Sequence, residues 1–222
     1  MGKIIFYMPT PTTDGRAWLE YGDYQDEHGT YATSPTRRKN HRWIQYLWTV
    51  KQKEAIQVWY QPGVKIPELM NIANDDQIYI RGHGFPGKES ISMAKSWGTT
   101  VGHRFVVDRL KENGLPKTFS GKIKCYNCNS ASWFDGKRSF AQALADYMYG
   151  WGYKKCTYYG YRGKLDSYYK DGLAGLHKYV RANGGDTDGV CRASDARVQI
   201  KPQDLHPPQY ATISGLKKPI AE

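Results

Sequence analysis

The chain has 222 residues, and 32 Lys or Arg residues against 21 Asp or Glu residues give it a formal net charge of +11. With 40% hydrophobic and 24% charged residues and 18 tyrosines, the composition excludes a disordered chain and is typical of one soluble globular domain with a full core. The positive charge favours an anionic partner, and a solvated basic surface explains it equally well because the charges are scattered.

No segment predicts a membrane span or a cleaved leader. The apolar run 4–8 is too short for either, and Phe6 stands where a myristoylation motif requires Ser or Thr. The spacing of the four cysteines suggests no disulfide framework, which favours a reducing compartment. We therefore expect a cytoplasmic protein, or one that is delivered into the cytosol of a target cell.

In the first part of the chain, short β-rich runs alternate with helical patterns. The expected elements, in chain order, are a strand over 3–8, a long loop over 9–38 with a hairpin around 21–31, a helix over 40–53, a strand over 55–60, a short helix from Pro67 and a strand over 77–81.

The middle of the chain continues this alternation after a loop over 84–98. A helix follows, with a buried stripe of Val101, Phe105, Val106 and Leu110. The next expected elements are a strand over 122–127, a turn at Asp135-Gly136, a helix that Ser139 caps and Gly150 ends, and a strand over 156–161. The helix has an apolar stripe of Phe140, Ala141, Leu144, Ala145 and Met148.

This order of elements predicts an α/β fold with a mainly parallel central sheet flanked by helices. Residues 1–165 form the expected core domain, and 166–222 form a C-terminal extension that packs on the core and ends in a partly ordered tail. Within the extension we expect a helix in 168–181 and a last strand over 196–200.

Two stretches of similar build each place a reactive side chain just past a predicted strand. His83 follows the strand over 77–81, and Cys128 follows the strand over 122–127. Ligands and catalytic groups gather at the carboxyl edge of such sheets, and a thiol beside an imidazole forms a nucleophile and base pair. The backbone N–H groups of Gly84 and Cys128 are then natural donors for an oxyanion hole.

Other interpretations of these residues are open. Cys125-x-x-Cys128 also fits a redox pair or half a zinc site, but Cys125 lies inside a strand and no further ligands are specified. We expect core positions for Cys125 and Cys156, and no metal. His103 is a competing base, but it lies off the predicted stripe, which favours a surface position.

The chain is similar to the clan CD cysteine peptidases, which include caspases, gingipains, clostripain and the self-processing protease domains of large bacterial toxins. That family carries its catalytic His in a His-Gly pair after one strand and its Cys after the next, as His83-Gly84 and Cys128 stand here. Leu115-Pro116 before the Cys strand and Gly160–Gly163 at the end of the next strand also match. The resemblance covers about residues 1–165 and is nearest the toxin-processing branch, and it lacks the caspase Gln-Ala-Cys motif.

This resemblance implies a three-layer caspase-like fold and a cysteine endopeptidase that cleaves, or self-cleaves, proteins in a bacterial toxin or effector. His83 and Cys128 are the implied dyad, and no cofactor is required. The specificity pocket of such folds comes from loops at the carboxyl edge of the sheet. There Asp166 could select a basic residue or Arg162 an acidic one, and the sequence does not rank them.

In the toxin-processing branch, inositol hexakisphosphate activates the protease through a basic surface. Lys170, Lys178 and Arg181 are the candidate residues for such a polyanion site here. Two alternatives from other classes stay open: a Cys/His acyl-transfer effector of the deamidase kind, and a non-catalytic module that binds nucleic acid or a polyanion. The second would use basic residues interleaved with aromatics, namely Arg37, Arg38, Lys39 and Arg42 near Trp43 and Tyr46.

Overall fold

The structure is a computed structural model. It describes the backbone of residues 2–14, 24–25, 31–32, 44, 46–49, 51–94, 99–172, 175–181 and 190–203. Side chains are described for these ranges except 24–25, 31–32, 166–172, 175–181 and 190–191. Within these ranges no helix is long and apolar enough to cross a membrane.

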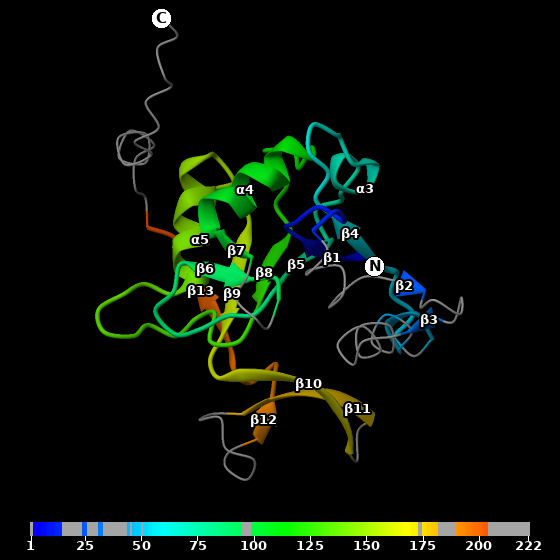
Figure 1. Ribbon diagram of the computed structural model, residues 1–222, viewed down its shortest axis with the longest axis vertical. Helices are drawn as coiled ribbons and strands as arrows, with labels where there is room; N and C mark the ends of the chain where they lie inside the picture. The colour runs from blue at the N-terminus through cyan, green and yellow to red at the C-terminus, as the bar shows by residue number, and fades with distance from the viewer. Residues whose placement is uncertain are drawn as a thin grey trace, which may run out of the picture.

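A six-stranded sheet forms the centre of the molecule, in the order β13-β9-β8-β5-β1-β4 (Figure 1). Neighbouring strands run parallel except for β13, which pairs antiparallel with β9. The strands are β1 (Ile4–Met8), β4 (Ala55–Trp59), β5 (Gln77–Arg81), β8 (Lys122–Tyr126), β9 (Thr157–Tyr161) and β13 (Arg197–Ile200). The predicted α/β class and the mainly parallel sheet are therefore confirmed.

Both faces of this sheet are covered, as the composition of β1 requires. All five residues of β1 are buried, which is usual for a central strand of a parallel sheet. Because side chains alternate along a strand, Ile5 and Tyr7 join one apolar cluster and Ile4 and Phe6 join the other.

Two helices, α4 (His103–Glu112) and α5 (Phe140–Gly150), lie side by side over one face. Ser139 caps α5 as expected, because its Oγ accepts a hydrogen bond from the N–H of Gln142. The predicted apolar stripe of α5 is buried throughout. Helical residues near Leu47 join the cluster on the opposite face of the sheet.

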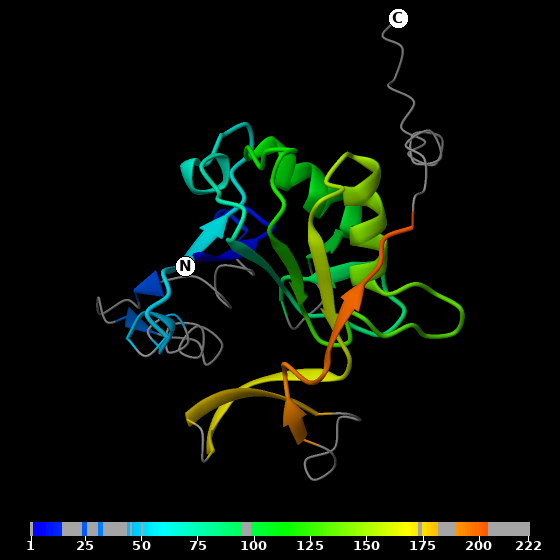
Figure 2. The ribbon, with the colours of Figure 1, turned by 180° about the vertical axis from the view of Figure 1, so that it is seen from behind.

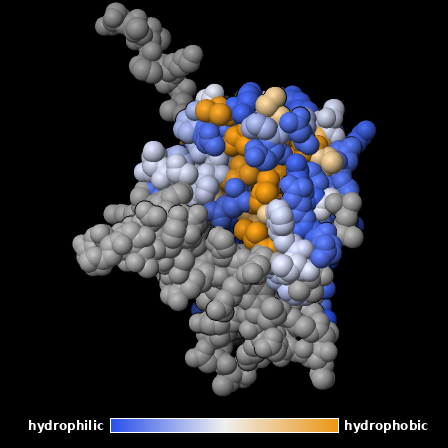
Figure 3. All heavy atoms as spheres, turned by 90° about the vertical axis from the view of Figure 1, so that its right-hand side faces the viewer, coloured by the Kyte–Doolittle hydropathy of each residue, from blue (hydrophilic) through white to orange (hydrophobic). Residues whose placement is uncertain are grey.

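Smaller elements complete the described part of the chain. The short helix α3 (Pro67–Met70) begins at the expected proline. The expected hairpin in the long loop is the antiparallel pair β2 (Tyr24–Gln25) and β3 (Tyr31–Ala32). Figure 3 shows an apolar strip on the side of the molecule where β4 forms the edge of the sheet.

The register of α4 differs from the prediction. Gly102 is the extended N-cap, so the helix starts at His103 and buries His103, Val106, Val107 and Leu110. The predicted stripe placed Phe105 in the core, and Phe105 is in fact exposed. The predicted surface position of His103 is also wrong. Both errors follow from counting the helical period from Val101, which lies in the strand β7 (Thr100–Gly102).

The expected helix over 168–181 is wrong as well. This segment contributes to β10 (Lys164–Gly172) and β11 (Gly175–Arg181), which pair antiparallel and continue into β12 (Val190–Arg192). Gly172 pairs with Gly175 across the two strands, a pairing that a continuous helix could not contain. Figure 2 shows this second sheet below the carboxyl edge of the central sheet, with β13 beside β9.

Two further details depart from the expected pattern. The loop over 84–98 holds a strand, β6 (Ser90–Ser92), which pairs with β7. The helix α5 ends at Gly150 as expected, but the left-handed glycine that follows it is Gly152, with φ of 101°.

Candidate active site

His83 and Cys128 lie at the same edge of the central sheet. They follow β5 and β8, which are adjacent and parallel, with Arg81 paired to Tyr126. Each residue therefore stands two positions beyond this last pair. The next residue, Gly84, packs directly on the Cys turn: a Cβ on Gly84 would lie 2.3 Å from the carbonyl oxygen of Cys128. The structure thus brings together the two chain segments that the sequence singled out.

The backbone at His83 is fixed by the β6–β7 hairpin. The N–H of His83 donates to the carbonyl of Ser92 at 2.7 Å, and the N–H of Ser92 donates back at 2.9 Å. Ser92 is fully buried. These reciprocal backbone bonds join the histidine segment to the buried strand β6. The sequence pattern does not reveal this support, because residues 90–92 fall within the loop expected over 84–98.

The turn that carries Cys128 is bonded to the strand on one side through Asn127. The side-chain amide of Asn127 donates to the carbonyl of Ile80 at 3.2 Å and to that of Gly82 at 3.3 Å. Asn127 is buried, so these bonds join the end of β8 to the segment just before His83. Asn127 is a positioning residue that the sequence did not reveal.

Ser130 joins the same turn to the strand on the other side. Its hydroxyl donates to the carbonyl of Cys125 at 2.6 Å and accepts a hydrogen bond from the N–H of Tyr161 at 2.9 Å. Asn129 has φ of 55°, a left-handed conformation in which Asn is tolerated. The sequence marked Ser130 only as a small neighbour of the thiol, whereas the structure gives it two buried partners.

The thiol of Cys128 is protonated at neutral pH in this arrangement. Its sulfur donates to the carbonyl oxygen of Leu165 at 3.8 Å. Burial raises the pKa of the Cys128 thiol above its ordinary value, and the nearby charges of Lys164 and Arg81 offset this only in part. A nucleophile of this kind needs a base to take its proton as it reacts.

The two candidate oxyanion donors are near neighbours. Among the described residues, no backbone carbonyl accepts a hydrogen bond from the N–H of Gly84 or of Cys128. The contact between Gly84 and the Cys128 carbonyl leaves no space for a side chain at position 84. Two such N–H groups are the donor type that stabilises a tetrahedral intermediate.

The other residues that the sequence proposed for this edge lie beyond β9. Arg162 is exposed, and its N–H donates to the carbonyl of Ala196 at 3.0 Å. Asp166 pairs with Tyr179 in the β10–β11 ladder. The polyanion candidates lie on the same two strands, and the side chains of all four residues are outside the described part: Asp166, Lys170, Lys178 and Arg181. The basic segment 37–42 also lies outside the described residues.

Cys125 and His103 do not share this edge. Cys125 is buried in the apolar cluster under α4 and α5, and burial raises its pKa. Burial lowers the pKa of His103 to about 4, and its Nδ1 lies 3.5 Å from a carboxylate oxygen of Glu89. Among the described residues there is no cluster of His, Cys, Asp and Glu that could hold a metal ion.

No family model matches the sequence, and no curated protein matches it either.

Proposed function

We propose that this protein is a cysteine peptidase of caspase-like fold that uses His83 and Cys128 as its dyad. The observation that carries the proposal is the contact of Gly84 with the Cys128 carbonyl. It sets a histidine segment against a cysteine turn at the carboxyl ends of two adjacent parallel strands. The family resemblance of the His-Gly pair and the Cys supports the same assignment.

The protonated thiol determines the order of the chemical steps. His83 takes the proton of Cys128 as the sulfur attacks the carbonyl carbon of the substrate, and the N–H groups of Gly84 and Cys128 stabilise the oxyanion. The imidazolium then gives its proton to the leaving amine, and the C–N bond breaks to leave a thioester. A water molecule, deprotonated by His83, attacks the thioester and releases the acid and the thiol.

Activity should depend on one thiol. The wild type would be incubated with a peptide library, and new N-termini would be identified by mass spectrometry. Cys128→Ala and His83→Ala should each lose more than about a thousandfold in turnover, and the double variant should lose little more because the two groups act as a unit. The matched control is Cys156→Ser, since Cys156 is another free, half-buried cysteine. Wild-type turnover by Cys128→Ala would refute the assignment.

The same experiment separates the alternatives. A deamidase would change the mass of side chains without creating N-termini. The affinity of a binding module for nucleic acid would not change in Cys128→Ala, and it would fall steeply with rising salt concentration. The role as a bacterial toxin or effector, the choice between Arg162 and Asp166 as selector, and activation by inositol hexakisphosphate stay predictions that rest on the resemblance.

A further inference from the structure

Three large aromatic side chains are exposed on the two loops that follow His83 and Cys128. Phe85 is 44% exposed, Trp133 52% and Phe134 65%. Single exposed aromatics are ordinary, but Trp133 and Phe134 are consecutive on one loop, and a concentration of exposed aromatics marks a surface that another molecule covers. Burying one such side chain contributes roughly 1.5–3 kcal/mol, so a ligand that covers this surface gains binding energy beside the thiol.

The two loops contact each other at the aromatic residues. The N–H of Gly87 donates to the carbonyl of Ser132 at 2.9 Å. Gly87 has φ of 62°, and a Cβ there would lie 2.8 Å from the carbonyl oxygen of Phe134. Gly87, two residues after Phe85, thus contacts the backbone of Ser132 and Phe134, the two chain neighbours of Trp133.

A tight turn fixes the local backbone at Phe134. The N–H of Lys137 donates to the carbonyl of Phe134 at 2.9 Å, and the N–H of Phe134 donates back at 3.3 Å. Between them, Asp135 and Gly136 have φ values of 50° and 68°. Two positive φ values with an Asp-Gly pair are typical of a type I′ turn. The aromatic residue at its base is therefore preorganised.

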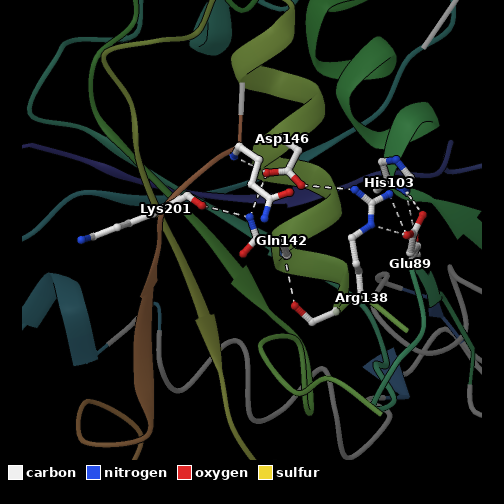
Figure 4. A network of polar contacts seen from close by, with 8 residues as sticks. Glu89, His103, Arg138, Gln142, Asp146 and Lys201 are labelled. Carbon is white, nitrogen blue, oxygen red and sulfur yellow. Dashed lines mark hydrogen bonds and ion pairs between the residues drawn. The ribbon is translucent and has the colours of Figure 1, made fainter. Parts of the chain in front are cut away.

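An ion-pair network anchors the far ends of both loops, as Figure 4 shows. The Nε and Nη2 atoms of Arg138, from the loop after Cys128, each lie 2.9 Å from Oε1 of Glu89, from the loop after His83. Nη1 of Arg138 lies 3.3 Å from Oδ2 of Asp146, which is fully buried on α5. This network holds the two loops together in one arrangement, and rigid presentation lowers the entropic cost of binding.

The charge carried by the two loops themselves favours a polypeptide over nucleic acid. The two loops carry three basic and two acidic residues, namely Lys88, Lys137 and Arg138 against Glu89 and Asp135. Single-stranded nucleic acid combines stacking on aromatics with a strongly positive groove, and this near balance does not supply one.

We infer that Phe85, Trp133 and Phe134 form a docking surface for the substrate polypeptide. The surface selects a segment with a large apolar side chain close to the bond that is cut. The location supports this, because Phe85 directly follows Gly84, which contacts the Cys128 carbonyl. The inference names the substrate class of the proposed peptidase and rests on that function.

Binding is measured without turnover, in the full chain carrying Cys128→Ala. The probes are fluorescein-labelled peptides that differ only in a central Phe, Leu or Ser, and the readout is fluorescence anisotropy. We expect the Phe and Leu peptides to bind at least about tenfold more tightly than the Ser peptide. Adding Trp133→Ser and Phe134→Ser should remove this preference. The matched control is Phe105→Ser, because Phe105 is 61% exposed on α4.

Each outcome bears on one proposal. Equal binding of the three peptides, or an unchanged preference after Trp133→Ser and Phe134→Ser, would overturn the docking surface. So would a labelled oligothymidine that binds more tightly than any peptide and loses its affinity in the same double variant. If the wild type cleaves no peptide while the apolar preference holds, the peptidase function fails and the docking surface stands. If cleavage ignores the double substitution, the docking surface fails and the peptidase function stands.

Discussion

Replacing Lys124 with methionine should stabilise the protein below neutral pH. Lys124 lies in β8, is only 5% exposed, and its Nζ donates to Oε1 of Gln77 at 2.8 Å and to the hydroxyl of Tyr79 at 2.9 Å. Burial lowers the pKa of Lys124 to about 7, with nearby positive charges adding to the effect. No carboxylate is among the groups that shift it, so folding below that pH places an uncompensated charge in the interior.

The magnitude follows from linkage between protonation and folding. The pKa of an unfolded lysine is about 10.4, so the unfolded state binds the proton more tightly than the folded state does. Stability therefore rises with pH between about 7 and 10, and below about pH 7 the full cost is present. At about 1.36 kcal/mol for each unit of pKa difference, the cost is roughly 5 kcal/mol. Lys124→Met removes this cost of burying the charge. It also removes two hydrogen bonds, which reduces the gain in stability by about 2 kcal/mol.

We expect Lys124→Met to raise the free energy of unfolding by roughly 2–3 kcal/mol at pH 6, and to lower it by about 1–2 kcal/mol at pH 10, where little of the charge cost is left and the lost hydrogen bonds dominate. Urea unfolding at both pH values measures this. Lys122→Met is the control, since Lys122 is exposed on the same strand. If the two variants change stability equally at both pH values, Lys124 is charged at no cost and the reasoning is refuted.

Two further predictions concern the site. Ser130→Ala should lower the free energy of unfolding by about 2–3 kcal/mol, because it removes a buried hydroxyl bonded to Cys125 and Tyr161; an unchanged urea midpoint would contradict the described turn. Gly84→Ala should lower peptide turnover by about a hundredfold, since the added methyl meets the Cys128 carbonyl and displaces the loop; wild-type turnover would show that the two segments do not pack together.

Most of the central sheet could be predicted from the sequence because its elements are locally specified. β1 and β5 are short β-rich runs between turn residues, and α5 has a cap and an apolar stripe that repeat at the helical period. The β10–β11 pair could not be predicted in the same way. Its apolar residues at 173, 176, 179 and 180 also fit a helical spacing, and only pairing between strands resolves such ambiguity.

The same distinction between local patterns and contacts between strands applies to the candidate site. His83 and Cys128 were visible because each follows a recognisable strand. Asn127 was not, because its partners Ile80 and Gly82 lie on another strand and nothing in the local pattern names them. The prediction wrongly placed His103 on the surface. It therefore also missed that His103 lies beside Glu89, which pairs with Arg138 to anchor the aromatic loops.

The antiparallel strand β13 forms one edge of the central sheet, and a long connection links it to its neighbour β9. β9 and β13 are neighbours that pair from Tyr161 and Arg197 onward, and the N–H of Arg162 donates to the carbonyl of Ala196 where the chain departs and returns. They are in effect the two arms of one β-hairpin, whose turn has expanded into the sheet β10–β12. Insertions and deletions in that expanded turn change what faces Cys128 while the pairing of the arms is kept. The fold therefore accepts changes in the length of this turn without altering the strand pairing that holds the segments of His83 and Cys128.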